Sequence, residues 1–204
     1  QAARLGADVT LYEMRPARRS AAHSGEALAE LVCSNSLGSD SAEHPSGNLK
    51  QELRELGSVI IQAADRFRVP AGGALAVDRE LFSSEVTRLI SENPRIKVIR
   101  GEVEDVRDVP WPAVIATGPL TSDPLMSSLE QMLGAGSLYM YDAVAPIVSA
   151  DSIDFSRVFA ASRYGKGEAD YINCPMDKEQ YLAFRDALVK AERLPLSRAE
   201  DMRL

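Results

Sequence analysis

The chain has 204 residues, of which 45% are hydrophobic and 26% are charged, and its formal net charge is -7. This length and composition are typical of a globular protein with one core, or with a core and part of a second domain. No apolar run is long enough to cross a bilayer, so we expect no membrane partner. The acidic charge disfavours a polyanion partner unless a local basic patch exists, and two cysteines without a visible leader predict a reducing, cytoplasmic location.

The first residues have the pattern of half a βαβ unit. Residues 1–5 resemble the tail of a helix that Gly6 caps, and residues 8–13 alternate as a strand that ends in Glu13. In dinucleotide-binding folds an acid at this place accepts the ribose hydroxyls, about 20 residues after a glycine-rich turn. Only 12 residues precede Glu13, so we expect that turn and the first strand to lie before residue 1. The alternative is an ordinary strand that ends in a solvated glutamate.

Further elements follow in helix and strand alternation. Apolar spacings of three and four predict one long helix over 48–67, and Asp78 is a plausible N-cap for a helix that ends near residue 92. Alternation and short apolar runs predict strands, and Gly134 is a plausible helix cap. The expected strands are 74–77, 96–99, 103–106 and 113–116, then 138–149 and 158–174, and the remaining helices are 124–133 and 177–191. The change to consecutive strands places a domain boundary near 134–145.

Three groups of residues could form a nucleotide half-site at the carboxyl ends of strands. These are Glu13, the Gly72-Gly73 turn and the Thr117-Gly118 dipeptide after the strand at 113–116. Glycine lets the backbone approach a ligand closely, because no side chain intervenes. In this order the elements favour FAD over NAD.

Two cysteine-containing segments could carry chemistry. Small hydroxyl and amide residues flank Cys33 and could hydrogen-bond a thiolate, although a buried structural thiol is the alternative. The segment Arg163-Tyr164-Gly165-Lys166-Gly167 precedes Cys174 and combines cations with an aromatic ring, as phosphate and base recognition requires; a basic loop of no special role is the alternative. His23 and His44 lack metal-ligand spacing to the cysteines, so we expect no metal site.

Six motifs together resemble one family, the folate- and FAD-dependent tRNA (uracil-5-)-methyltransferases (TrmFO family). The resemblance covers nearly the whole chain, and several of its motifs are long and unusual. The motifs are VTLYEMRP (9–16), LVCSNSL (31–37), VPAGGALAVDR (69–79), IATGPLTS (115–122), YDAVAPIV (141–148) and SRYGKGEADYINCPM (162–176).

The resemblance implies an α/β fold, in which 1–140 is a partial Rossmann-like FAD-binding domain without its first strand and 141–204 begins an α+β insertion domain. It implies methylation of C5 of a T-loop uridine in tRNA, with 5,10-methylenetetrahydrofolate as one-carbon donor, FAD as cofactor and NAD(P)H as reductant. The resemblance also implies that one of the two cysteines, Cys33 or Cys174, is the nucleophile and the other is the proton acceptor. The sequence does not decide which cysteine has which role. Arg163, Tyr164 and Lys166 become tRNA contacts, and the expected cofactor contacts are Glu13, Arg15, Ser34, Asn35, Gly72, Gly73, Val103, Thr117, Gly118 and Pro119.

Two other functions remain open at this point. One is a related flavoenzyme that modifies a wobble uridine or acts only as an NAD(P)H oxidoreductase, and the other is a non-catalytic FAD-fold fragment that binds RNA. The paired cysteines favour methylation, since hydride transfer alone does not need thiols at these places. Without the glycine-rich turn the pyrophosphate lacks its helix N-terminus, so we expect the chain alone to bind FAD poorly.

Overall fold

The computed structural model describes residues 1–20, 22–134, 148–162 and 168–192. The chain divides into two compact units, Gln1–Ser149 and Ala150–Leu204. The boundary expected at residue 140 lies outside the described residues, so the assignment of an FAD-binding and an insertion domain stays a prediction.

A parallel pair of strands carries the first candidate residue. The strand β1 (Val9–Glu13) pairs with β5 (Ile96–Arg100), and Glu13 lies opposite Arg100. The short 3-10 helix η1 (Ala3–Leu5) precedes β1 and ends at Gly6, whose φ of 96° is in the left-handed region that glycine tolerates. Because parallel strands share one carboxyl edge, Glu13 and Arg100 lie together at that edge, as the pattern of an open α/β sheet predicts.

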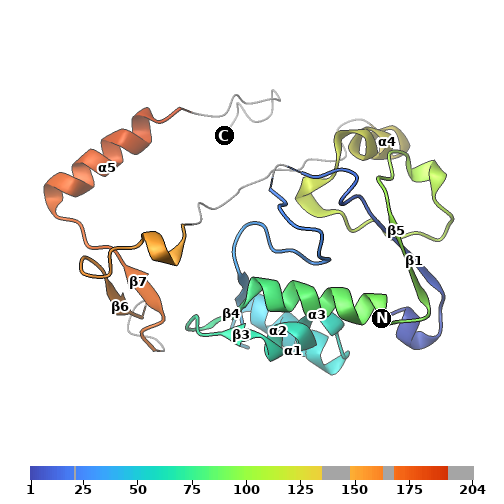
Figure 1. Cartoon of the computed structure of the whole chain (residues 1–204), viewed down its shortest axis with the longest axis horizontal. Helices are drawn as coiled ribbons and strands as arrows, with labels where there is room; N and C mark the ends of the chain where they lie inside the picture. Colours follow the sequence, from blue (N-terminus) through green and yellow to red (C-terminus); the bar gives the residue numbers. More distant parts are fainter. Residues whose placement is uncertain (21, 135–147, 163–167, 193–204) are drawn as a thin grey trace. The chain divides into compact units, whose positions relative to one another are not determined.

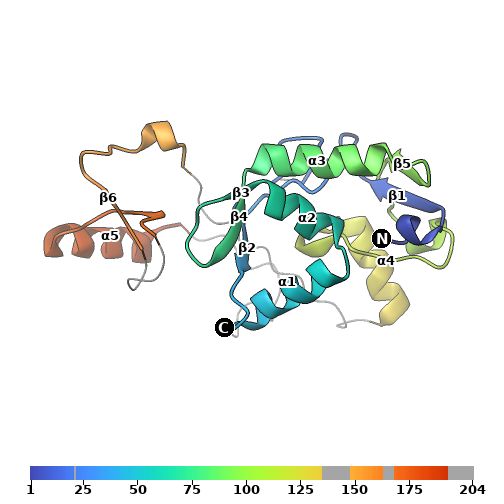
Figure 2. The same cartoon turned by 90° about the horizontal axis from the view of Figure 1, so that it is seen from below.

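The hydrophobic core forms around the buried strand β4 (Ala74–Val77), which lies between β2 (Ser36–Ser39) and β3 (Arg68–Val69) in an antiparallel sheet. Helices α2 (Val59–Arg66) and α3 (Arg79–Ser91) both contact this part of the chain (Figures 1 and 2). The core residues from these elements and from the loop before β2 are Leu28, Ala63, Ala64, Leu75, Val77, Phe82 and Val86.

Helix α3 begins where the sequence predicts. The carboxylate of Asp78 accepts hydrogen bonds from the backbone N–H groups of Glu80 at 3.1 Å and Leu81 at 2.9 Å. These bonds satisfy two N–H groups that the first turn of a helix otherwise leaves without partners. The cap therefore fixes the junction between β4 and α3, which the candidate site below uses.

The remaining elements are short. In the first unit, the 3-10 helices η2 (Val106–Asp108) and η3 (Gly118–Leu120) precede helix α4 (Asp123–Leu133). In the second unit (Figure 1), the 3-10 helix η4 (Ala150–Ser152) precedes the antiparallel strands β6 (Phe159–Ala161) and β7 (Tyr171–Asn173) and helix α5 (Lys178–Lys190). The helices predicted at 124–133 and 177–191 are thus confirmed. For 138–149 and 158–174 the sequence predicts strands joined by loops. The first range falls largely outside the described residues, and the second contains the paired strands β6 and β7.

The single helix predicted over 48–67 is wrong. The chain forms α1 (Pro45–Glu55) and then α2, with a break at Gly57, whose φ is 65°. Ser58 follows as the N-cap of α2. The apolar spacing continued across the break, but a left-handed residue and a new cap end one helix and start another.

Two of the predicted strands are absent from the described structure. At 103–106 Asp105 caps the turn η2 by accepting a hydrogen bond from the backbone N–H of Arg107 at 2.9 Å. At 113–116 the backbone is irregular, and Val114 is 92% exposed. A short apolar run becomes a strand only when a neighbouring strand pairs with it, and within the described residues none does.

Gly47 offers a test of the packing near β2. A Cβ atom built on this residue would lie 1.9 Å from the carbonyl oxygen of Ser41, a backbone atom. We expect Gly47→Ala to lower the free energy of unfolding by about 1–3 kcal/mol, because the backbone must shift. Urea denaturation followed by circular dichroism measures this. The control is Gly101→Ala, where a Cβ would meet nothing within 4 Å; an equal loss in both variants would contradict the packing argument.

Candidate functional site

The carboxylate of Glu13, at the end of β1, is held by the side chain of Arg15. Nε of Arg15 donates to Oε1 at 2.9 Å, Nη2 donates to Oε2 at 3.0 Å, and the backbone N–H of Arg15 donates to Oε1 at 3.0 Å. A carboxylate offers about four acceptor positions, so hydrogen bonds from the described residues take three of them and leave one, on Oε2. Glu13 can therefore accept one further hydrogen bond, for example from a ribose hydroxyl.

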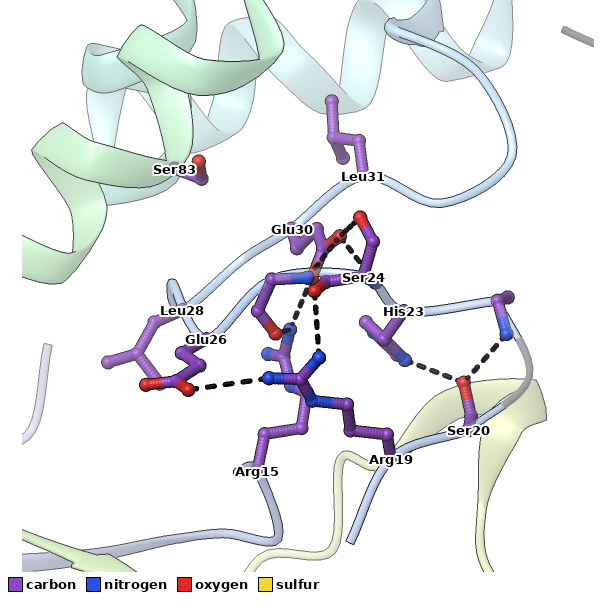
Figure 3. A network of polar contacts seen from close by, with 12 residues as sticks. Arg15, Arg19, Ser20, His23, Ser24, Glu26, Leu28, Glu30, Leu31 and Ser83 are labelled. Atoms are coloured by element: carbon purple, nitrogen blue, oxygen red, sulfur yellow. Dashed lines mark hydrogen bonds and ion pairs between the residues drawn. The ribbon is translucent and has the colours of Figure 1, made fainter. Parts of the chain in front are cut away.

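Arg15 also holds a second carboxylate, which comes from the loop before β2. Its Nη1 donates to Oε2 of Glu30 at 2.7 Å, and the arginine is only 3% exposed (Figure 3). Glu30 accepts three further hydrogen bonds, from the backbone N–H of Ser24, the hydroxyl of Ser24 and the backbone N–H of Gly25. The guanidinium therefore ties the end of β1 to the loop that leads to Cys33.

The interactions within this cluster lower the pKa values of both of its carboxyl groups. Partial burial acts to raise the pKa of Glu13, but hydrogen bonds and the charge of Arg15 outweigh it and hold that pKa below its ordinary value. Partial burial acts to raise the pKa of Glu30 as well, and here the hydrogen bonds from Ser24 and Gly25 and the charge of Arg15 lower it. Both carboxylates are therefore ionised at neutral pH.

Cys33 is an exposed residue, which disfavours the alternative of a buried structural thiol. A cavity of about 510 Å³ lies beside this segment, lined by residues from the loop and from the β4–α3 junction. The lining residues include Ser34, Asn35, Val77, Asp78 and Arg79. The structure therefore brings two of the predicted cofactor residues, Ser34 and Asn35, to one cavity, and these two residues directly follow the predicted nucleophile in the chain.

The other predicted cofactor residues lie at separate turns. Gly72 and Gly73 form the turn between β3 and β4, and the φ of Gly72 is 58°. Thr117 precedes η3, which contains Gly118 and Pro119, and its hydroxyl lies 2.6 Å from that of Thr121. Val103 packs against the small cluster of Val106, Leu125 and Leu129. Their contact with a cofactor stays a prediction.

The predicted residues near the end of the chain divide into two groups. Cys174 follows β7 in the second unit, and its thiol is exposed. Arg163, Tyr164 and Lys166 lie outside the described residues. Their assignment to tRNA therefore stays a prediction.

Two residues of the site have no role in the sequence-based prediction. Glu30 is the single acid in the apolar stretch of residues 27–32, and an isolated acid in an apolar run is the signal that indicates a buried ionic partner. Arg79 lies in the motif VPAGGALAVDR, and its guanidinium donates a hydrogen bond to the backbone carbonyl of Leu31. No spacing in the sequence indicates that contact, because 48 residues separate the two.

Comparison with known proteins shows the family to which the chain belongs. The chain matches the glucose inhibited division protein A family over residues 1–203, and it belongs to that family. Its relatives include proteins named methylenetetrahydrofolate--tRNA-(uracil-5-)-methyltransferase TrmFO. That of Moorella thermoacetica is 56% identical over 96% of this chain, that of Rubrobacter xylanophilus is 54% identical over 98% of this chain, and that of Lactococcus lactis subsp. cremoris (strain SK11) is 52% identical over the whole of this chain. The resemblance to the TrmFO family is thus confirmed.

The chain spans 44–45% of the length of these three relatives. In the described part of the chain no helix has the length and apolar character to cross a membrane. The same residues contain no group of three or more histidine, cysteine or acidic side chains that could hold a metal ion.

The Arg15 contacts predict a large stability difference between two neighbouring arginines. Arg15→Met leaves two partly buried carboxylates without their partner, so we expect a loss of about 3 kcal/mol in the free energy of unfolding. Arg19 is the control, because its ion pair with Glu26 at 3.3 Å is exposed, and Arg19→Met should cost less than about 1 kcal/mol. Urea denaturation at pH 7 compares them, and equal losses would show that the Arg15 cluster is not a structural constraint.

The lowered pKa of Glu30 predicts that this residue contributes to the loss of stability in acid. Its pKa in the folded protein lies below the ordinary value of 4.5, so its contribution is fully present above about pH 4.5 and is lost as the pH falls through the folded pKa. We expect Glu30→Gln to be less stable than the wild type at pH 7 and to lose stability less steeply below about pH 4.5. Thermal unfolding between pH 7 and pH 3 measures this, with the exposed Glu26→Gln as control. A wild-type slope in Glu30→Gln would refute the prediction.

Proposed function

We propose that the protein to which this chain belongs is a folate- and FAD-dependent tRNA (uracil-5-)-methyltransferase. It transfers a one-carbon unit from 5,10-methylenetetrahydrofolate to C5 of a T-loop uridine and uses NAD(P)H as reductant, in the cytoplasm. The observation that carries this proposal is the exposed Cys33 in a loop whose next two residues line a cavity, in a chain more than 50% identical to enzymes of that name.

The residues fit FAD at its ribose end. Glu13 lies at the carboxyl edge of a parallel strand pair and keeps one acceptor position, which suits a ribose hydroxyl. When bound, the flavin supplies the redox chemistry by which NAD(P)H provides the two electrons that turn a methylene into a methyl group.

Uracil C5 is a poor nucleophile, and addition of a thiolate to the neighbouring C6 makes it more nucleophilic. Addition of the Cys33 thiolate to C6 forms an enolate, and C5 then attacks the electrophilic one-carbon unit. A second group must accept the C5 proton as the nitrogen that carried the one-carbon unit leaves. A hydride that derives from NAD(P)H then completes the methyl group, and the thiolate leaves C6 as the ring double bond returns. Cys174 is our candidate for that group, although the two cysteines could exchange roles. Arg163, Tyr164 and Lys166 remain our candidates for tRNA contacts.

The two alternative functions have less support. A wobble-uridine flavoenzyme or a simple oxidoreductase does not require a thiol at position 33, and the relatives reported above are named as uracil-5 methyltransferases. A non-catalytic RNA-binding fragment would not require an exposed cysteine in a loop that lines a cavity. Methylation is therefore the function that the site favours.

A donor comparison tests this function. We expect the intact protein, with its FAD, to methylate unmodified tRNA with methylenetetrahydrofolate and NAD(P)H, and not with S-adenosylmethionine. Cys33→Ala should lower the rate by at least about a hundredfold, because the nucleophile is lost. Incorporation of labelled carbon measures both, and the flavin content of the variant serves as the folding control. Activity with S-adenosylmethionine alone would refute the family's chemistry, and full activity of Cys33→Ala would refute the role of that residue.

A further inference from the structure

The segment around Cys33 is attached to the rest of the fold on both sides. Two residues before the cysteine, the carbonyl of Leu31 accepts a hydrogen bond from Nη2 of Arg79. Two residues after it, Asn35 exchanges hydrogen bonds with Val77: the Val77 N–H donates to the Asn35 carbonyl at 2.9 Å, and Nδ2 of Asn35 donates to the Val77 carbonyl at 3.1 Å. Both attachments therefore end on residues 77–79.

These three residues lie where the hydrophobic core of the first unit meets the capped start of helix α3. Val77 is 0% exposed and lies in the core, and Asp78 caps helix α3 with two hydrogen bonds. One turn further on, Phe82 is 1% exposed and anchors the helix in the same core. Motion of residues 77–79 would disturb core packing, so they are suited to hold an exposed loop in one place.

The partner of Arg79 distinguishes it from another arginine of the same helix. Arg88 pairs with Glu85 and Glu92 on the surface of α3, an arrangement that stabilises the helix locally. Arg79 is only half exposed and instead reaches a backbone carbonyl 48 positions earlier in the chain. A hydrogen bond from a charged donor to a loop carbonyl orders the loop rather than the helix.

We propose that Arg79 is a positioning residue that, with the Asn35–Val77 pair, holds in one place the loop that carries Cys33, the loop whose residues Ser34 and Asn35 line the cavity. The catalytic importance of this position rests on the proposed function, whereas the anchoring itself does not. An exposed loop samples many conformations, and a displacement of about 1 Å of a reacting group can cost about a hundredfold in rate. In this proposal Arg79 acts through the loop, by the hydrogen bond that it donates to the Leu31 carbonyl.

The test compares Arg79→Met, which removes the donor, with Arg79→Lys, which keeps one, and with Arg88→Met as the matched control on α3. In the intact protein we expect Arg79→Met to raise amide hydrogen exchange of residues 31–36 by about tenfold. It should also change the rate at which iodoacetamide alkylates Cys33, while Cys174 serves as the internal reference. The kcat of tRNA methylation should fall about ten- to a hundredfold, with the KM for tRNA within twofold.

Arg79→Lys should restore at least part of each of these changes, and Arg88→Met should match the wild type. Exchange and alkylation in Arg79→Met equal to those in Arg88→Met would overturn the proposal. If Arg79→Met does not fold, Asn35→Asp decides instead, because it replaces the donor to the Val77 carbonyl with an acceptor; unchanged exchange of residues 31–36 would then overturn it. A wild-type protein without methylation activity would refute the proposed function, whereas exchange and alkylation would still decide the anchoring.

Discussion

The contact between Arg15 and two carboxylates is the constraint on which the candidate site depends. Arg15 is buried, and it binds Glu13 at the end of β1 and Glu30 in the loop that precedes Cys33. Burial of a guanidinium is costly unless its charge is paired and its donors are used, and here the two acids meet both conditions. A single side chain thus joins the strand edge expected for a nucleotide to the segment that carries the candidate nucleophile.

A second constraint acts on the other side of the same segment. The β4–α3 junction is fixed by core packing and by the Asp78 cap, and it holds the loop through Arg79 and through the backbone and side chain of Asn35. The amide of Asn35, which the sequence assigns to the cofactor, thus also has a structural partner in Val77. Between the two constraints the loop leaves the thiol of Cys33 exposed. Exposure in a fixed place is what a nucleophile requires, since it must meet its substrate and meet it in one geometry.

Elements defined by local chemistry were predictable, and those that depend on a partner were not. The start of α3 follows from Asp78, and the end of α4 follows from Gly134, because a cap acts within one turn. The expected strand at 113–116 depends on a neighbouring strand, and the described structure gives it none. Residues 48–67 have continuous helical spacing, yet the left-handed Gly57 divides them into two helices. Periodicity records which residues are apolar and not where the backbone turns.

The sequence by itself determined the family and the candidate thiols, because both depend on residue types in long motifs, and it determined the strand that ends in Glu13. The tertiary structure decided what surrounds those residues. It assigned Arg15 to two acids, left one acceptor position on Glu13, and brought Arg79 to a carbonyl 48 positions away. Such contacts join segments that are distant in the chain, and their partners are selected by packing rather than by spacing along the sequence.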